Sequence, residues 1–142
     1  MKKVLVLCTG NSCRSIIGEA LINALGAGRY LASSAGSHPT GEVHPQALAT
    51  LSNHKIPIDQ ARSKSWDEFS ADSFDVVLTV CDEAARETCP VLVGKHQRIH
   101  WSIPDPARVA GSSSDIQLAF ESTYEVLRKR IEVELLSEDV QR

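Results

Sequence analysis

The stretch from Phe74 to Val80, FDVVLTV, constrains the fold more than any other part of the chain. It is nearly all apolar, as expected of a strand that is covered on both faces. Strands of this kind belong to parallel sheets, because antiparallel sheets usually leave one face in contact with water. We therefore predict an α/β protein with a parallel sheet between layers of helix.

The rest of the chain alternates between strand and helix patterns. The strand patterns cover Lys2–Leu7, Tyr30–Ala35, Phe74–Val80 and Arg98–Trp101. The first two helix patterns cover 16–25 and a stretch that begins at Pro45. Ser65 and Glu68 form the capping-box pattern of a short helix, and a further helix pattern runs from Asp82 to Arg86. A final helix follows Ser114, and its apolar stripe consists of Phe120, Tyr124, Leu127, Ile131 and Leu135. This order predicts one domain over 1–142, with a four-stranded parallel sheet and helices on both faces.

Composition excludes several classes of protein. The chain has 142 residues, enough for one domain with a core of its own. Fifteen Lys and Arg against eighteen Asp and Glu give a net charge of −3, so no global basic field attracts nucleic acid or an anionic membrane. Thr9 to Asn11 interrupt the N-terminal apolar run too early for a signal peptide. We expect a cytoplasmic protein whose four cysteines stay reduced.

The sharpest motif is CTGNSCRS, residues 8–15, between the first strand and the first helix. A tight loop there directs the backbone N–H groups of Thr9, Gly10, Asn11, Ser12, Cys13, Arg14 and Ser15 toward one point, and the helix N-terminus adds partial positive charge. This predicts a cradle for a tetrahedral oxyanion. Arg14 can grip two of the anion's oxygens at once, and Asn11 tolerates a left-handed backbone.

Cys8 is expected at the floor of this cradle. The loop amides and Arg14 favour its thiolate, and the Ser15 hydroxyl can donate a hydrogen bond to the sulfur, so we expect a nucleophile with a lowered pKa. An inert thiol at a strand end is the alternative, since free cysteines are often buried. Cys13 is expected to face the core from the first helical turn.

The spacing Cys-x5-Arg-Ser is the signature of cysteine-dependent phosphatases, and CTGNSCRS resembles the low-molecular-weight phosphatase family and its arsenate reductase branch. SAGSHPTG at 34–41 with Pro45, and His100-Trp101 followed by PDPA at 104–107, resemble that branch in particular. The resemblance runs from Val4 to about Leu135. It implies a phosphatase-like fold, arsenate as substrate with phosphate or sulfate as mimics, and no cofactor.

Asp105 stands between two prolines that restrict its backbone. Alone it would be a turn residue, but the resemblance implies a general acid that protonates the departing oxygen. Phosphatases of this family follow the Asp-Pro pair with tyrosines that hold an aromatic substrate. Ala107 and Arg108 stand here instead, which favours a small inorganic oxyanion.

Cys81 and Cys89 follow the apolar strand. The cysteines and histidines lack the paired spacings of a zinc site, so no metal is expected. On an intact helix the two Cα atoms would be ~12 Å apart, too far for a disulfide unless the segment unwinds. The resemblance implies that they are the resolving cysteines of thioredoxin-coupled reductases. Two buried core thiols are the alternative.

The resemblance leaves several points open. Thioredoxin, or glutathione with glutaredoxin, would be the electron donor, and a cysteine at the position of Cys13 bridges to the nucleophile in some relatives. Some thioredoxin-coupled relatives hold potassium where Arg62 and Lys64 stand here, and two cations there argue against a bound ion. The rival functions are a low-molecular-weight protein phosphatase, which needs only the loop and Asp105, and a phosphocarrier module, which needs neither Arg14 nor Asp105.

Overall fold

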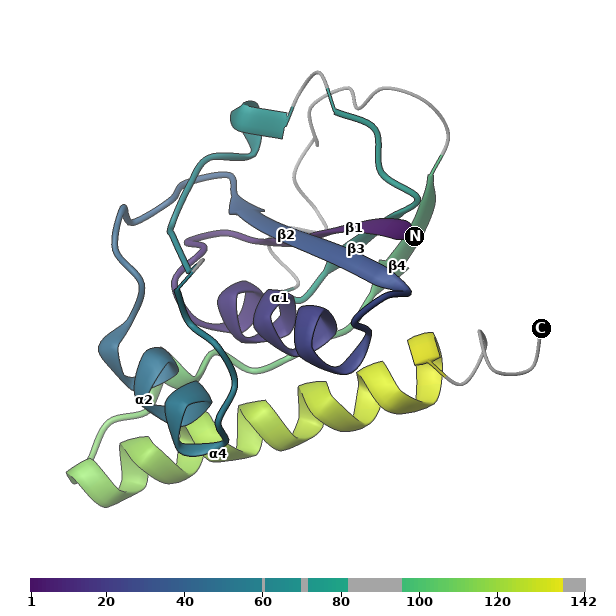
Figure 1. Cartoon of the computed structure of the whole chain (residues 1–142). Coiled ribbons are helices and arrows are strands. Elements are labelled where there is room, and N and C mark those ends of the chain that lie inside the picture. Colours follow the sequence, from purple (N-terminus) through teal and green to yellow (C-terminus); the bar gives the residue numbers. More distant parts are fainter. Residues whose placement is uncertain (60, 70–71, 82–95, 137–142) are drawn as a thin grey trace.

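The structure, a computed structural model, describes residues 1–59, 61–69, 72–81 and 96–136. Four strands form one sheet: β1 (Lys2–Cys8), β2 (Tyr30–Gly36), β3 (Val76–Thr79) and β4 (Gln97–His100). Their order is β2-β1-β3-β4, and all neighbouring strands are parallel (Figure 1). The predicted four-stranded parallel sheet is confirmed.

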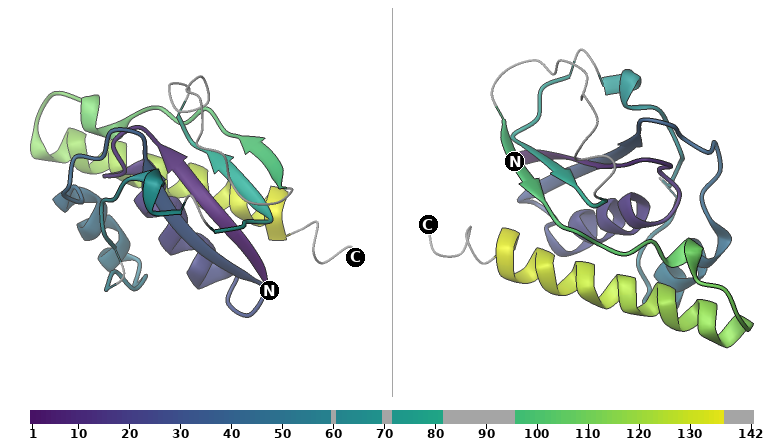
Figure 2. Two further views of the ribbon diagram at one scale, coloured as in Figure 1. Left: turned by 90° about the horizontal axis from the view of Figure 1, so that it is seen from above. Right: turned by 180° about the vertical axis from the view of Figure 1, so that it is seen from behind.

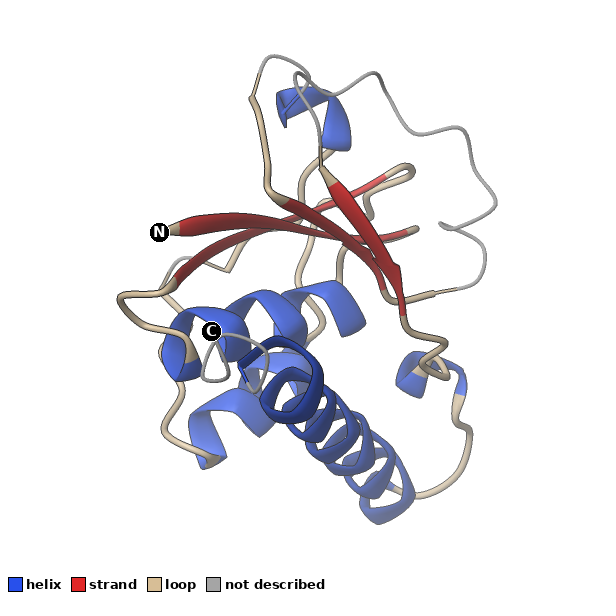
Figure 3. Cartoon of the chain, turned by 90° about the vertical axis from the view of Figure 1, so that its right-hand side faces the viewer, coloured by secondary structure: helices blue, strands red, loops and turns tan. Residues whose placement is uncertain are grey.

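Three α-helices lie on one face of this sheet: α1 (Arg14–Leu25), α2 (Pro45–Asn53) and α4 (Ser113–Arg130), which continues as the π-helix η3 (Ile131–Leu136) (Figures 1 and 3). Pro45 occupies the first turn of α2, where its missing N–H costs nothing. The predicted apolar stripe of the last helix is buried along its whole length: Phe120, Tyr124, Leu127, Ile131 and Leu135.

The second face of the sheet carries a smaller core. Along β1, Val4 and Val6 face the helices, whereas Leu5 and Leu7 pack on the other face. Trp66 and Phe69 of the one-turn 3-10 helix η1 (Trp66–Phe69) pack against that second cluster. The ribbon of η1 lies on the side of the sheet away from α1 (Figure 2). Both faces are therefore covered, as the apolar strands predict. The helix predicted from Asp82 lies outside the described residues.

Of the two hydrogen bonds in the capping box predicted at Ser65 and Glu68, the one to the Ser65 hydroxyl is present and the one to the Glu68 carboxylate is not. The Ser65 hydroxyl accepts from the N–H of Asp67 at 3.1 Å, as a cap should. The Glu68 carboxylate does not reach back; instead both of its oxygens accept from the Arg62 guanidinium, at 2.8 and 3.1 Å. A bidentate partner is stronger than a single backbone N–H, which explains the change.

The strand order also places the site. The chain leaves β1 toward β2 on one side and leaves β3 toward β4 on the other, so the carboxyl ends of β1 and β3 flank a topological switch point. Cys8 ends β1 and Cys81 follows β3, and both lie at this edge. No helix within the described residues is long and apolar enough to cross a bilayer.

Candidate active site

The loop of residues 8–15, called here the thiol loop, connects β1 to α1. Cys8 is buried at the end of β1, and Cys13 caps α1, which starts at Arg14. Asn11 has a positive φ of 48°. This left-handed backbone, which the sequence predicts for Asn11, is one that asparagine tolerates better than most residues.

The carbonyl groups of the thiol loop are turned outward. Three of them accept backbone hydrogen bonds from the 38–44 segment: Thr9 from His38 at 2.9 Å, Gly10 from Thr40 at 3.0 Å and Ser12 from His44 at 3.0 Å. In a trans peptide the C=O and the following N–H point in opposite directions. The N–H groups after these carbonyls therefore point inward, the arrangement an oxyanion cradle needs.

Gly36 explains how β2 can lie against this loop. A Cβ atom at Gly36 would collide with the carbonyl oxygen of Thr9 and come within 3.0 Å of the carbonyl oxygen of Cys8. Both are backbone atoms, which cannot rotate away as a side chain would. Only glycine therefore fits where the last residue of β2 passes the loop.

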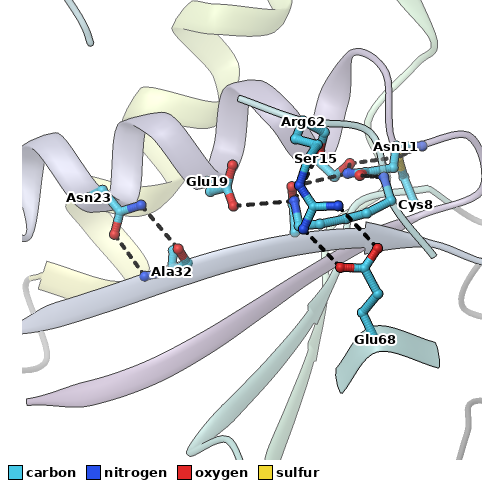
Figure 4. Close-up of polar contacts among 10 residues, drawn as sticks. Cys8, Asn11, Ser15, Glu19, Asn23, Ala32, Arg62 and Glu68 are labelled. Atoms are coloured by element: carbon cyan, nitrogen blue, oxygen red, sulfur yellow. Dashed lines mark hydrogen bonds and ion pairs between the residues drawn. The ribbon is translucent and has the colours of Figure 1, made fainter. Parts of the chain in front are cut away.

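Asn11 organises the polar groups beneath the thiol (Figure 4). Its side-chain Oδ1 accepts from the N–H of Lys64 at 2.8 Å, which fixes the orientation of the amide. Its Nδ2 therefore donates to the Ser15 hydroxyl at 2.7 Å and to the Ser34 hydroxyl at 3.0 Å. Because Ser15 accepts from Asn11, its own proton is free for the Cys8 sulfur, 2.8 Å away.

The pKa of Cys8 differs in direction from the sequence-based expectation. Burial raises the pKa of the Cys8 thiol, and the neighbouring Cys81 raises it further. Hydrogen bonds from Ser15 and from the N–H of Asn11, at 3.2 Å from the sulfur, oppose this shift without overcoming it. The predicted lowering of the pKa is thus wrong for this arrangement, because desolvation of a thiolate at the end of a buried strand outweighs its donors.

Cys13 faces the core, as predicted. It is 4% exposed, and burial raises the pKa of its thiol to about 11. The charges of Asp105 and Cys8 act in the same direction, while the Ser12 hydroxyl and the Arg14 guanidinium act against them. Cys13 is therefore a protonated, apolar neighbour of Cys8 at neutral pH.

Arg14 and Asp105 meet across the mouth of the loop. Arg14 Nη1 donates to the Ile103 carbonyl oxygen at 2.9 Å, and its Nη2 lies 3.6 Å from Asp105 Oδ2. Asp105 caps the 3-10 helix η2 (Pro106–Arg108) by accepting from the N–H of Ala107 at 3.0 Å. Arg108 Nε lies 3.7 Å from the same carboxylate. Asp105 therefore both caps the turn and faces Arg14 at the site.

Two cavities open around these side chains. One, of about 290 Å³, is lined by Cys8 and most of the thiol loop together with Asp105 and Arg108. The other, of about 300 Å³, is lined by Cys81 and by the 102–105 segment. Arg14, Asp105 and Arg108 line both. The space in front of Cys8 is thus open to a small anion beside two guanidinium groups, of Arg14 and Arg108, and the carboxyl group of Asp105.

Cys81 is the second buried thiol of the site. It is 2% exposed, and its sulfur lies 3.6 Å from the Thr9 hydroxyl. Thr9 directly follows Cys8, so one side chain of the thiol loop contacts the second thiol. Cys8 and Cys81 therefore lie close together, whereas Cys89 lies outside the described residues.

Among the described residues, one group could hold a metal ion: His54, Glu121 and Glu125. None of the thiol-loop residues belongs to it. His54 Nε2 lies 2.9 Å from the Glu121 carboxylate, and its ring stacks on Tyr124 at 3.9 Å. These contacts, a hydrogen bond and a ring stack, join the end of α2 to α4.

The sequence predicts no site role for three residues near the loop, Glu19, Ser34 and Lys64, and Lys64 enters there only as a cation that argues against bound potassium. Ser34 belongs to the SAGSHPTG stretch that carries the resemblance, which was the one available signal. Glu19 and Lys64 carry no motif, and only the fold brings the two side chains together, at 3.8 Å.

The fold and the thiol loop together define a phosphatase-like α/β protein with a cysteine at the start of the loop between β1 and α1. The chain belongs to the low molecular weight phosphotyrosine protein phosphatase family, whose model matches residues 3–142. The family resemblance of the sequence is thereby confirmed.

Several relatives within this family are named as arsenate reductases. An arsenate reductase of Halalkalibacterium halodurans is 32% identical over 92% of both chains, and a glutaredoxin arsenate reductase of Synechocystis is 35% identical over 75% of this chain and 79% of its own. Among solved structures, an arsenate reductase in the phosphate binding state has a TM-score of 0.73 at 29% identity, covering 93% of this chain and 95% of its own. A thioredoxin-dependent arsenate reductase of Corynebacterium glutamicum has a TM-score of 0.69 at 28% identity, covering 96% and 63%.

Proposed function

We propose that this protein is an arsenate reductase. The observation that carries the proposal is the second buried thiol, Cys81, in contact with Thr9 of the thiol loop. A phosphatase needs a single thiol, whereas reduction of arsenate to arsenite requires two electrons, which a pair of thiols can supply. The names of the relatives support the same activity.

In the first step, arsenate binds in the thiol loop with its oxygens on the backbone N–H groups and Arg14. The Cys8 thiolate attacks arsenic, a sulfur–arsenic bond forms, and one arsenate oxygen leaves. Asp105, acting as general acid, gives that oxygen its proton. The 3.6 Å contact between Arg14 and Asp105 leaves both groups facing the cavity where this oxygen would depart.

In the second step, the Cys81 thiolate attacks the sulfur of Cys8. A disulfide forms, the sulfur–arsenic bond breaks, and its electron pair stays on arsenic, which leaves as arsenite. Cys89 then attacks Cys81, releases Cys8 as a thiolate and forms the Cys81–Cys89 disulfide. A dithiol donor returns that disulfide to two thiols, so two electrons pass from the donor to arsenic in each turnover.

The donor in this proposal is thioredoxin, with glutathione and glutaredoxin as the other possibility. Thioredoxin fits a resolving pair such as Cys81 and Cys89, and the Corynebacterium relative is named as thioredoxin-dependent. The Synechocystis relative is named for glutaredoxin. Either donor works in the cytoplasm, where we expect the protein to act in detoxification.

A second candidate is a phosphatase that hydrolyses phosphomonoesters through a cysteinyl-phosphate. The observation in its favour is that Cys8, Arg14 and Asp105 already line one cavity. Cys81 separates the two candidates, because a phosphatase has no step that uses it.

The test is a single addition of arsenate to reduced Cys89→Ser, without reductant. We expect about one equivalent of arsenite and a disulfide between Cys8 and Cys81 in peptide mass mapping, because Cys89 acts only after arsenic has left. The parent should end with Cys81 bound to Cys89, and multiple turnover with thioredoxin should fail in the variant.

Cys81→Ser serves as the matched control, because it should form no arsenite in the same assay while keeping any phosphatase activity. Full multiple turnover of Cys89→Ser with thioredoxin would overturn the relay and favour resolution by glutathione. Unchanged arsenate turnover in Cys81→Ser would overturn the two-thiol proposal altogether.

A further inference from the structure

His44 lies at the junction between the thiol loop and α2 and has no part in the mechanism above. It is the N-cap of α2, and its Nδ1 accepts a hydrogen bond from the backbone N–H of Gln46 at 3.0 Å. A backbone N–H can only donate, so this nitrogen of the imidazole carries no proton. The cap therefore satisfies one of the N–H groups that the first turn of a helix leaves without a partner.

The backbone of the same residue contacts the thiol loop. The N–H of His44 donates to the carbonyl oxygen of Ser12 at 3.0 Å. Ser12 and Cys13 share one peptide group, in which the C=O and the N–H point in opposite directions. The hydrogen bond to His44 therefore turns the N–H of Cys13 toward the space where the anion would lie. His44 thus joins the first turn of α2 to one donor of the predicted cradle.

Two further contacts hold His44 in place. Pro45 restricts His44 to extended backbone, and the ψ of His44 is 129°. The imidazole packs against the ring of Phe120 in α4, with the ring centroids 4.8 Å apart, and Phe120 is fully buried. The helices α2 and α4 contact each other (Figure 1). The position of His44 is therefore set by the packed helices and not by the loop that it contacts.

The other two outward carbonyl groups of the thiol loop have donors with a different support. His38 and Thr40 donate to them from residues that belong to neither a helix nor a strand. Gly41, in the same segment, has a left-handed backbone with a φ of 86°. His44 differs from these donors because its side chain ties it to a helix. The peptide between Ser12 and Cys13 is thus fixed from the core of the protein.

We propose that His44 is a positioning residue for anion binding: its imidazole caps α2 and thereby holds the peptide between Ser12 and Cys13 with its N–H directed at the oxyanion. This inference rests on the proposed role of the thiol loop in binding arsenate. Among the described residues, those that line the cavity in front of Cys8 include Ser12 and Cys13 but not His44. His44 therefore acts through the loop and does not touch the anion.

Loss of the imidazole acceptor should weaken anion binding and leave the thiol unchanged. Without the cap, the first turn of α2 loosens, and the Ser12 carbonyl no longer has a donor in a fixed position. The peptide must then be ordered each time an anion binds, which lowers the affinity. The donors to the Cys8 sulfur come from Ser15 and Asn11, which do not depend on this cap.

Three variants separate the cap from the other contacts of His44. His44→Ala removes the acceptor and the ring together. His44→Asn restores an acceptor, because asparagine is among the best N-caps, but it does not restore the packing on Phe120. Ser112→Ala is the matched control, since the exposed Ser112 caps α4 by accepting from the N–H of Asp115 at 3.2 Å. It removes a helix cap of the same kind from another helix.

The experiment measures iodoacetamide labelling of Cys8 by peptide mass mapping over a series of sulfate concentrations, at one mildly alkaline pH. Sulfate is a tetrahedral dianion throughout this range, so its protection of Cys8 reports the affinity of the thiol loop for an oxyanion. We expect the protecting concentration to rise about fivefold in His44→Ala, the factor that corresponds to one typical N-cap, and to stay within about twofold of the parent in His44→Asn and Ser112→Ala. The labelling rate without sulfate should be the same in every variant.

Unchanged protection in folded His44→Ala would overturn the proposal. An equal loss in Ser112→Ala would also overturn it, because the effect would then be one of general stability, and an equal loss in His44→Asn would assign the effect to ring packing instead of the cap. If His44→Ala does not fold, His44→Gly takes its place, because glycine is tolerated at an N-cap far better than alanine.

The same assay keeps this inference apart from the proposed function, because labelling needs no arsenate. A parent in which sulfate protects Cys8 but arsenate is not reduced would refute only the proposed function. A parent that sulfate does not protect would refute the positioning role together with the oxyanion cradle.

Discussion

The two sides of the site are held in different ways. On the thiol side, Cys8 accepts from Ser15 at 2.8 Å and from the N–H of Asn11 at 3.2 Å, and the Asn11 side chain makes three hydrogen bonds of 2.7 to 3.0 Å. On the acid side, Asp105 faces Arg14 at 3.6 Å and Arg108 at 3.7 Å, and its 3.0 Å hydrogen bond is local, to Ala107.

This difference matches two requirements of the proposed reaction. The thiol must hold one orientation, whereas the contacts between Arg14 and Asp105 must give way to the anion. Attack by sulfur needs a nucleophile that is oriented before the anion arrives, and a buried network provides such preorganisation. In the proposed reaction the Arg14 guanidinium binds the incoming anion, and an ion pair as long as 3.6 Å with a partly exposed carboxylate costs little to break. The thiol side is therefore a fixed frame, and the acid side is a set of contacts that an anion can replace.

The largest effect is expected from Asp105→Asn, on the acid side. The variant keeps the shape of the side chain but has no proton to give, so the chemical step should slow by on the order of 10² to 10⁴. Phosphate affinity and thermal unfolding should stay close to those of the parent. Single-turnover arsenate reduction measures the rate, and a parent-like rate with chemistry limiting would leave Asp105 with only its turn role.

Asn11→Ala should have the largest effect on the thiol side, and this effect should appear in stability. The substitution removes three buried hydrogen bonds and places alanine at a φ of 48°, so we expect a loss of roughly 3 kcal/mol of unfolding free energy. Denaturant unfolding measures it. Asn11→Asp is the matched control, since it keeps the backbone preference and the acceptor for Lys64 but loses the donor. A loss below about 1 kcal/mol in the alanine variant would contradict a fixed thiol side.

The pH dependence of thiol labelling at Cys13 tests how completely the thiol side is buried at the start of α1. A rise of the pKa from an ordinary 9.0 to about 11 leaves roughly one hundredth as much thiolate at neutral pH. Cys13 should therefore label about a hundredfold more slowly than the same cysteine in the unfolded chain. Because the folded-state pKa is the higher one, the associated stability is present below pH 9 and is lost as the pH rises through about 11. Equal labelling of folded and unfolded Cys13 at pH 8 would contradict this burial.

The smallest effect is expected from Arg108→Gln. Its side chain is 75% exposed and its contact with Asp105 is long, so the free energy of unfolding should change by less than ~0.5 kcal/mol. The rate of the chemical step should stay within about threefold of the parent. A large loss of stability would show that the acid side is held as firmly as the thiol side, contrary to the comparison.

The fold was predictable because its signals are local. The apolar run at Phe74–Val80, the stripe from Phe120 to Leu135 and the strand-to-helix position of the thiol loop each follow from spacing within one segment. The left-handed Asn11 was predictable for the same reason, since residue type and a tight loop suffice.

The rest depends on contacts between distant segments. The direction of the Cys8 pKa shift is set by how deeply the sheet and the helices bury the sulfur, which a motif does not record. Glu68 satisfies the spacing of a capping box but has a better partner in Arg62, and Lys64 finds Glu19 only when β2 and α1 are packed together. Cys89 remains a prediction from the resemblance.

The strand order has a consequence for how such enzymes can arise. Because β1 and β3 are neighbours at the centre of the sheet, Cys81, two residues after β3, lies beside the loop after β1. Placing a thiol there needs one codon change and no rearrangement of the backbone. A phosphatase of this fold could thus acquire a second thiol beside its first by a single substitution. Later substitutions could add the third cysteine, which passes electrons from a donor to that thiol. The topology makes redox chemistry a short mutational distance from phosphate chemistry, which is a useful starting point for redesign in either direction.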